Sequence, residues 1–322
     1  MFEKRSELIK FLAVVETGKI QLTAEKLNTT QPALSRIISK LEGQFKGQLF
    51  ERIPTGVRVT PFGEHIAEQA RHILREIEFA EAEVNGAITG RTGNLRMTAG
   101  PMWMQSIMPR VINSFHAKYP GIELQIRTTS YKEGILHLSS GESDLHCGAF
   151  GSEEPLPQFL KRERIIDMQV GVVAHDTHPI FQKEKKVTYH DLVRFPWLTL
   201  DEVIDNAKDN HGWPTSSMVL DELYERTGER VKTIVQVDAA GLFLMSTGPY
   251  LTYLSLNFAQ HLSNLSLKPI PFVFGFGDRT FRAGIVARRS IEGTYAFRFF
   301  KELVRTEASR YFLGNTISAN NG

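Results

Sequence analysis

The chain has 322 residues, of which 42% are hydrophobic and 23% charged, so it can bury more than one core and about two domains are expected. Its charged N-terminus and the lack of a long apolar run argue against a signal peptide and a membrane span. The only cysteine, Cys147, cannot form an internal disulfide, which favours a cytoplasmic protein.

Apolar residues recur at helical spacing near the N-terminus. The positions i, i+3, i+4 and i+7 are Leu8, Phe11, Leu12 and Val15. Gly18 follows where such a helix would end. A second short helix is expected over residues 22–27, ended by Asn28 in the left-handed conformation.

A third helix is expected almost at once. Thr29 or Thr30 can cap it, and Pro32 is tolerated in its first turn. Its apolar stripe consists of Leu34, Ile37, Ile38 and Leu41. The outward positions are then Gln31, Pro32, Ser35, Arg36, Ser39 and Lys40, which include donors for phosphate oxygens or base edges. This pattern is typical of a recognition helix, and a solvated face on an ordinary helical hairpin is the alternative.

Two short strands are expected next, around the turn Pro54-Thr55-Gly56. This hairpin carries Arg52 and Arg58. Residues 1–62 contain ten Lys or Arg and six Glu, a net charge of +4. A small basic module of this kind suits a polyanion such as DNA.

Residues 22–64 carry a dense motif. Its members are Ala24, Leu27, Gln31, Pro32, Ala33, Leu34, Ser35, Leu41, Glu42, Leu49, Phe50, Glu51, Arg52, Thr60 and Gly63. The motif resembles the winged helix-turn-helix of LysR-type transcriptional regulators. Two positions depart from that pattern: Thr23 replaces the usual alanine, and Thr55 occupies a wing position that is often arginine.

The resemblance implies which residues contact double-stranded promoter DNA. The base contacts are expected from Gln31, Pro32, Ser35 and Arg36. The phosphate contacts are expected from Thr30, Lys40, Arg52 and Arg58. Thr29, Ser39 and Thr55 complete the expected DNA-binding set.

Residues 64–88 predict a long helix with a heptad seam. The seam positions alternate in spacing between four and three residues and are Ile66, Ala70, Ile73, Ile77, Ala80 and Val84. A net charge of −4 over this segment disfavours DNA and favours pairing with a second copy. A helix packed only on its own domain is the alternative. In the resembled family this helix forms the dimer, which sets two recognition helices about 34 Å apart, or a multiple of that, on an inverted repeat.

After a polar, Gly-rich hinge, strand-length apolar runs alternate with helical stretches, which predicts an α/β domain with a mostly parallel sheet. Strands are expected at residues 94–100, 122–130, 144–150, 168–175, 196–200, 233–238, 250–255 and 281–288. Helices are expected at residues 104–120, 131–141, 189–195, 218–228, 239–248 and 295–308.

A second, looser resemblance covers this region. GNLRM at 93–97, FHAKYPGIEL at 115–124, SSGESDL at 139–145, HPIF at 178–181 and Gly248 recur in the effector domain of the same family. That domain is similar to periplasmic solute-binding proteins. The resemblance implies a winged helix-turn-helix at 1–62, a linker helix and hinge at 63–92, and a two-lobed Rossmann-like effector domain at 93–322. Lobe I should hold about 93–164 and 271–310, and lobe II about 165–270.

In such domains the ligand binds at the carboxyl ends of strands, in a cleft between the lobes. The positions nominated on this basis are Gly100, Pro101, Met102, Trp103, Thr128, Thr129, Ser130, Phe150, Leu200 and Asp238. The N–H groups of the helix near Met102 could hold an anion. Met102 and Trp103 stand where smaller polar residues are common in the family, which favours a bulky or aromatic effector. Core packing is the alternative for each position.

Other chemistry finds little support. His175 and His178 lack the further ligands that a metal site needs, so no metal is expected. His146 and Cys147 are neighbours on a strand and should face opposite ways, which disfavours a His-activated thiolate. No Gly-x-Gly-x-x-Gly, phosphate loop or Gly-x-Ser-x-Gly occurs, so neither a nucleotide cofactor nor acyl transfer is expected.

The resemblance therefore implies a ligand-responsive transcription factor rather than an enzyme. Dimers would pair again through the effector domains into a tetramer. Ligand-driven closure of the lobes would change the DNA bend met by RNA polymerase. The alternative is a binding protein or enzyme built on the C-terminal fold, with the N-terminal helices used only for assembly. DNA binding by a fragment ending near Gly90 would separate the two.

Overall fold

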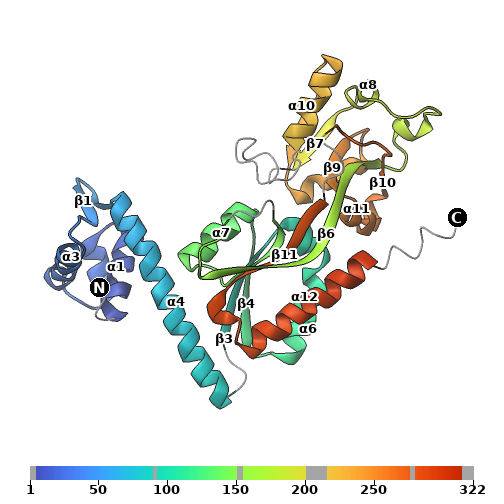
Figure 1. Cartoon of the computed structure of the whole chain (residues 1–322). Helices are drawn as coiled ribbons and strands as arrows, with labels where there is room; N and C mark the ends of the chain where they lie inside the picture. The colour runs from blue at the N-terminus through green and yellow to red at the C-terminus, as the bar shows by residue number, and fades with distance from the viewer. Residues whose placement is uncertain (1–4, 90–92, 151–154, 201–215, 276–279, 314–322) are drawn as a thin grey trace. The chain divides into compact units, whose positions relative to one another are not determined.

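The computed structural model of the chain describes residues 5–89, 93–150, 155–200, 216–275 and 280–313 (Figure 1). The chain divides into two compact units. The first holds residues up to 96 with 121–124 and 135–144, and the second holds 97–120, 125–134 and the chain from 145 onward. Within the described ranges, no helix has the length and apolar character needed to cross a membrane.

The first unit begins with the expected helices and hairpin. These are α1 (Arg5–Thr17), α2 (Ile20–Lys26), α3 (Gln31–Phe45), β1 (Phe50–Ile53), β2 (Gly56–Val59) and the long α4 (Pro61–Thr89). The predicted helix ends are confirmed, since Gly18 and Asn28 have φ angles of +63° and +48°. Thr30 caps α3 by accepting a hydrogen bond from the N–H of Ala33 at 3.3 Å. Thr23 is buried, and its hydroxyl donates to the carbonyl of Lys19 at 2.9 Å.

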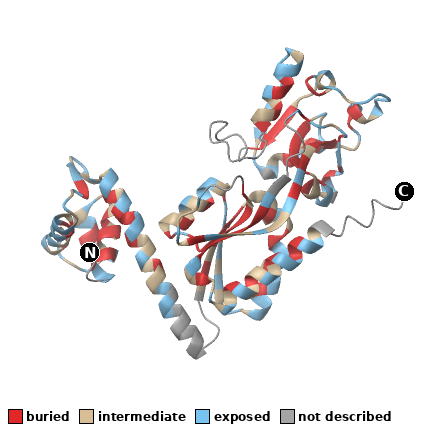
Figure 2. Ribbon diagram, in the orientation of Figure 1, coloured by how far each residue is buried: buried red, intermediate tan, exposed pale blue. Residues whose placement is uncertain are grey.

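These helices share one hydrophobic core, which appears as the buried interior of the N-terminal part in Figure 2. Leu34, Ile38 and Leu41 of α3 are buried in it, as the predicted stripe requires, while Ile37 is half-buried. Phe11 of α1 meets Phe50 of β1 edge-on, with ring centroids 5.7 Å apart. The inward side of α3 is therefore set by packing, which leaves its polar side outward.

The seam of α4 divides into two parts. Ile66 and Ala70 belong to the core of the first unit, because α4 packs against α1. Ile73, by contrast, is 36% exposed, Ile77 is half-buried and Ala80 is exposed. The side chain of Val84 and the hinge at residues 90–92 lie outside the described residues. Within the described seam, the surface open to a partner helix thus begins at Ile73.

A buried ion pair fixes the middle of α4 within the first unit. Arg75 donates from Nε to Oδ1 of Asp144 at 2.7 Å, and its Nη2 donates to the other carboxylate oxygen. The backbone N–H of Arg96 donates to the same carboxylate at 2.8 Å. The Asp144 side chain is completely buried, whereas Glu78, the second partner of Arg75, is 46% exposed. Asp144 therefore joins α4 to the start of the first strand of the sheet.

One nine-stranded sheet forms the C-terminal region, in the order β4-β3-β5-β11-β6-β9-β7-β8, with β10 beside β6. The strands are β3 (Gly93–Ala99), β4 (Ile122–Thr128), β5 (Leu145–Phe150), β6 (Leu160–His175), β7 (Trp197–Leu200), β8 (Ile234–Val237), β9 (Leu251–Ser255), β10 (Leu267–Pro269) and β11 (Thr280–Arg288). β3 runs parallel to β5, and β7 runs parallel to both β8 and β9. The expected α/β architecture is confirmed, but the sheet is mixed and not mostly parallel, because β6 and β11 run antiparallel to their neighbours.

Two segments of the chain connect the two halves of this sheet. β6 pairs with β11 as far as Gln169 and with β9 from Val170 onward. The chain returns through β10 and residues 270–275 towards β11. We use lobe I for the strands from β4 to β11 and lobe II for β9, β7, β8 and β10, with β6 running through both.

Helices cover both lobes. They are α5 (Pro101–Ser106), α6 (Met108–Lys118), α7 (Tyr131–Ser140), α8 (Tyr189–Leu192), α10 (Ser216–Thr227), α11 (Leu256–His261) and α12 (Tyr295–Leu313), with 3-10 turns η1 (Pro179–Gln182), η2 (Ala239–Ser246), η3 (Ser263–Leu265) and η4 (Arg289–Ile291). The single helix expected at 104–120 is broken at Ile107, because Pro109 lies in the first turn of α6. The helix expected at 239–248 is the 3-10 turn η2.

Replacing Asp144 with Asn should destabilise the protein by about 3–5 kcal/mol, because Arg75 would remain buried without its partner charge. Glu78→Gln is the matched control, and since that side chain is half exposed its cost should stay below about 1 kcal/mol. Urea denaturation of the full chain, followed by circular dichroism, measures both. Equal midpoints for the two variants would contradict the structural role of the Arg75–Asp144 pair.

Candidate nucleic-acid interface and ligand site

The outward face of α3 consists of polar and charged side chains. Gln31, Pro32, Arg36, Ser39 and Lys40 are exposed, Ser35 is half-buried, and at the preceding turn Thr30 is exposed and Thr29 half-buried. Since Leu34, Ile38 and Leu41 hold the opposite side in the core, this face cannot turn inward. An α-helix with an exposed face of this composition fits the width of a DNA major groove.

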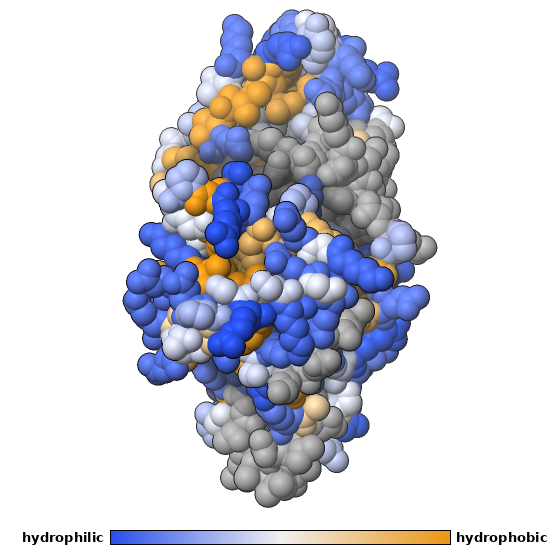
Figure 3. Space-filling view, turned by 90° about the vertical axis from the view of Figure 1, so that its left-hand side faces the viewer, coloured by the Kyte–Doolittle hydropathy of each residue, from blue (hydrophilic) through white to orange (hydrophobic). Residues whose placement is uncertain are grey.

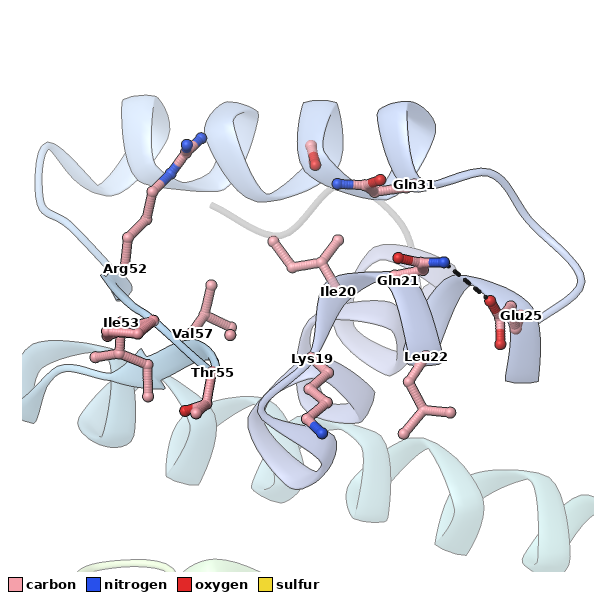
Figure 4. Close-up of a pocket in the computed structure, with 13 residues that line it drawn as sticks. Lys19, Ile20, Gln21, Leu22, Glu25, Gln31, Arg52, Ile53, Thr55 and Val57 are labelled. Atoms are coloured by element: carbon pink, nitrogen blue, oxygen red, sulfur yellow. Dashed lines mark hydrogen bonds between the residues drawn. The ribbon is translucent and has the colours of Figure 1, made fainter.

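A groove lies beside this face, between the start of α2, the first turns of α3 and the hairpin. Its volume is about 620 Å³. Figure 4 shows Lys19 and Gln21 from the start of α2, Gln31 from α3, and Arg52 and Thr55 from the hairpin around it. Gln21 donates to Glu25 at 3.4 Å. The groove therefore brings together polar groups from three segments of the first unit.

The cations around this surface differ in their partners. Lys40 pairs with Glu7 at 3.0 Å, and Arg58 pairs with Glu51 at 2.6 Å across the hairpin. The Nε of Arg36 donates to the carbonyl of Pro32 at 3.3 Å. Among the described residues, no carboxylate pairs with Arg36, Arg52 or Lys19. These three exposed cations can therefore bind an anionic ligand without first breaking an ion pair.

The hairpin is fixed to the turn between α1 and α2. The N–H of Val57 donates to the carbonyl of Gly18 at 2.8 Å. Gly56 has a φ angle of +145°, and a Cβ atom at this position would lie 2.3 Å from the same carbonyl oxygen. Only glycine allows this close approach. The contact holds Arg52 and Thr55 next to the start of α2.

Lys19 and Gln21 line the groove but were not among the residues predicted from the sequence. The sequence predicts a second helix that begins at residue 22, whereas α2 begins at Ile20 with Lys19 as its N-cap residue, so both residues lie outside the predicted helix. Their position at the amino end of the first helix of the helix-turn-helix was the signal that could have identified them.

Four of the predicted effector-binding residues lie in lobe I, at or just after the carboxyl ends of β3, β4 and β5. Their side chains are buried or half-buried. Trp103 is 2% exposed and Thr129 is 8% exposed. Among the described residues, neither the indole Nε1 of Trp103 nor the hydroxyl of Thr129 has a hydrogen-bond partner. Phe150 is buried beneath Arg162, whose guanidinium lies 5.3 Å from the ring centroid. Met102 is half-buried and packs against the hydrophobic cluster of lobe II.

The remaining predicted positions are hydrogen-bonded within the chain, packed in a core, half-buried or exposed. Ser130 and Glu133 exchange hydrogen bonds at the start of α7, and Asp238 accepts from the N–H of Gly241 at 3.0 Å. Leu200 is buried in lobe II, and Thr128 is exposed. The remaining two, Gly100 and Pro101, are half-buried, and they precede a helix of only six residues, which weakens the expected anion site there.

The buried histidines His146 and His178 and the cysteine Cys147 have structural surroundings. The buried His178 accepts a hydrogen bond from the N–H of Ile180 at 3.0 Å, and desolvation lowers its pKa. His146 shares a 2.9 Å hydrogen bond with Thr98. Burial raises the pKa of the Cys147 thiol, which keeps it protonated and unreactive at neutral pH. Within the described ranges, no cluster of three metal-ligating side chains occurs.

Comparison with known proteins assigns the family. The model of the bacterial regulatory helix-turn-helix protein, LysR family, matches residues 6–64, and the model of the LysR substrate binding domain matches residues 89–309. The chain belongs to the LysR family of bacterial regulatory proteins.

Individual relatives agree with this assignment. The transcriptional regulator GbpR of Rhizobium radiobacter is 30% identical over 195 residues, which span 60% of this chain and 64% of that relative, less than two thirds of its length. ArgP from Mycobacterium tuberculosis shares the fold with a TM-score of 0.68 at 19% identity, covering 96% of this chain and 98% of that one. Full-length CbnR complexed with its target DNA has a TM-score of 0.58 at 19% identity, covering 94% and 99% of the two chains.

Two glycine substitutions should change stability in opposite directions. Gly56→Ala should destabilise the protein by about 2 kcal/mol, since the new Cβ would collide with the carbonyl of Gly18. Gly43→Ala should stabilise it by about 0.5–1 kcal/mol, because Gly43 lies inside α3 with no atom near its missing side chain. Thermal unfolding of the full chain measures both. A Gly56→Ala variant as stable as the wild type would mean that the hairpin does not rest on that carbonyl.

Proposed function

We propose that this protein is a transcriptional regulator that binds double-stranded promoter DNA through α3 and the hairpin. The observation that carries the proposal is the juxtaposition of an outward polar helix face with exposed, unneutralised cations at Lys19, Arg36 and Arg52. Polyanion binding rests on such cations, because they release counterions from DNA phosphates. CbnR, which shares the fold, has been solved with its target DNA.

The proposed DNA contacts fall into base contacts and phosphate contacts, according to where each residue lies on the surface. Gln31, Pro32, Ser35 and Arg36 lie on the first turns of α3 and are proposed to contact bases. Thr30, Lys40, Arg52 and Arg58 are proposed to contact phosphates, with Thr29, Ser39 and Thr55 at the edges of the footprint. Lys19 and Gln21 join the phosphate set because they share the groove with Arg52. Lys40 and Arg58 would have to exchange their carboxylate partners for phosphate.

The C-terminal domain is proposed to bind a small effector between its lobes. Buried polar groups are normally hydrogen-bonded, so the unpaired Trp103 indole and Thr129 hydroxyl support a polar ligand at the strand ends of lobe I. The aromatic surroundings of Trp103 and Phe150 support a bulky or aromatic one. The proposed role is that of a cytoplasmic regulator, neither an enzyme nor a transport receptor.

Self-association is proposed to use two surfaces. On α4, the exposed part of the seam around Ile73, Ile77 and Ala80 would pair with a second copy. In lobe II, Ile234 of the edge strand β8 and Phe243 of η2 are 50% and 58% exposed. Figure 3 shows a hydrophobic patch near the top of the view, on the part of the molecule that lobe II forms. Pairing through both surfaces would give a tetramer. Closure of the lobes would then change the angle between the two DNA-bound dimers, and with it the bend of the promoter DNA to which RNA polymerase binds.

Arg36→Ala should weaken binding to the operator by about 1–3 kcal/mol and relax selectivity at one base position. Arg52→Ala should weaken binding to every duplex and reduce the dependence of log K on log salt by about one unit, as expected for a lost phosphate contact. Fluorescence anisotropy with operator and random duplexes across a salt series measures both effects.

Lys268→Ala is the control for net charge, because Lys268 is exposed on β10 in lobe II. It should leave both the affinity and the salt dependence unchanged. If all three variants weakened binding equally on both duplexes, the first unit would only attract DNA by charge, and the proposed base contacts would be abandoned.

Ile73→Glu should shift the protein from dimer or tetramer towards smaller species, because it places a charge in the exposed part of the seam. Gln69→Glu, an exposed position on the same helix outside the seam, adds the same charge and should have no effect. Light scattering after size-exclusion chromatography reports the mass. An unchanged assembly in the Ile73→Glu variant would remove α4 from the interface.

A further inference from the structure

Lobe II contains a cavity of about 750 Å³ that lies apart from the proposed effector residues. Its wall is made by residues 169–171 of β6, residues 186–189 at the start of α8, Leu256, and residues 269–273 after β10. Not one of the ten strand-end positions nominated for the effector is among these lining residues. Since β6 changes its neighbouring strand at Gln169 and Val170, the cavity borders both connections between the lobes.

The inner surface of this cavity is apolar and aromatic. Val170 and Ile270 form a buried floor at 7% and 4% exposure. The rings of Tyr189 and Phe272 meet edge-on with centroids 4.9 Å apart. Val273, at 59% exposure, completes the lining. Binding of a flat hydrophobic group to this surface is favourable, because it removes apolar area of both partners from water.

The aromatic wall is held in place from behind. The hydroxyl of Tyr189 donates to Oε1 of Glu222 at 2.5 Å, and the N–H of Gly275 donates to the same oxygen at 2.5 Å. Glu222 lies on α10 and is 8% exposed. Desolvation raises the pKa of Tyr189, so its hydroxyl stays protonated and keeps donating. A wall fixed in this way loses little conformational freedom when a ligand binds.

The lining of the cavity carries a positive charge. Lys186 lines the cavity, and none of the described lining residues is acidic. Among the described residues, no carboxylate pairs with Lys186, whereas the nearby Lys183 is paired with Asp191. The hydroxyl of Thr188 is also occupied, since it donates to Asp191. The free cation at an apolar cavity is complementary to an anionic group on an otherwise hydrophobic molecule.

We propose that this cavity is a second ligand site, which binds an aromatic carboxylate with its rings against Tyr189 and Phe272 and its carboxylate at Lys186. The site is separate from the effector site proposed between the lobes and does not depend on it. A ligand here touches β6 and residues 269–273 together, so it contacts both connections on which any movement of one lobe against the other depends.

The site can be located with 4-benzoylbenzoate, an aromatic carboxylate whose ketone forms covalent adducts with nearby C–H groups under near-ultraviolet light. The full-length protein is irradiated with it, digested and mapped by mass spectrometry. Adducts are expected within residues 169–171 or 269–273, and an excess of 2-naphthoate should suppress them. Adducts confined to other segments would overturn the proposal.

Two lysine variants test the recognition of charge by calorimetric titration of 4-benzoylbenzoate. Lys186→Glu should weaken binding about tenfold, because an opposing charge replaces the cation. Lys185→Glu, the neighbouring exposed lysine outside the lining, should change it less than about twofold. The methyl ester of the probe should bind the wild type about as weakly as the acid binds Lys186→Glu. Equal effects of the two lysine variants, or an ester that binds as well as the acid, would overturn the proposal.

A filling variant tests the cavity itself. Val273→Trp should reduce both the photochemical adducts and the calorimetric binding, because the larger ring takes up space at a lining position that is exposed and tolerant of change. The circular dichroism spectrum and the thermal unfolding midpoint of this variant should match those of the wild type. These readouts show that the protein is folded without relying on the proposed regulatory function. Undiminished binding of the probe to a folded Val273→Trp variant would place the ligand elsewhere.

Discussion

Leu34, Ile38 and Leu41 hold α3 in the core of the first unit, and this packing determines which side of the helix faces outward. Turning α3 about its axis would expose these side chains to water, at a cost of about 1.5–3 kcal/mol for each. The polar face with Gln31 and Arg36 is therefore presented as a rigid surface. The hairpin is placed beside it through the backbone contact between Val57 and Gly18. The proposed DNA-binding surface thus follows from the core rather than from its own contacts.

The N-terminal helices and the hairpin could be predicted almost entirely from the sequence, because helical periodicity, the Thr30 cap and the left-handed Asn28 are local signals. The sheet was predictable in outline, and all eight expected strands are present. The first half of β6 was missed because it is rich in charge, yet Glu163 there pairs with Lys301 and Arg305 of α12. That pairing is a long-range contact which no local pattern reveals.

The functional residues were less predictable than the fold. Strand ends located Trp103 and Thr129, but the same rule also nominated Leu200, which is buried in lobe II, and Asp238, which caps η2. A position at a strand end does not reveal whether its side chain serves the core, a cap or a ligand. Likewise, heptad spacing could not show that Ile66 and Ala70 pack within their own unit while Ile73 remains exposed. The Arg75–Asp144 pair and the cavity beside Tyr189 depend on residues far apart in sequence and had no sequence signal.

The most direct test of the account is a footprint of the full-length protein on the DNA upstream of its own coding region, titrated across salt and against a random duplex. The account predicts sequence-selective protection of two half-sites whose centres are separated by about one helical turn, roughly 34 Å, or a multiple of it. Such a pattern requires both the recognition helix and a dimer. Weak protection without preferred positions, lost equally on both duplexes as salt rises, would contradict sequence-specific recognition by α3.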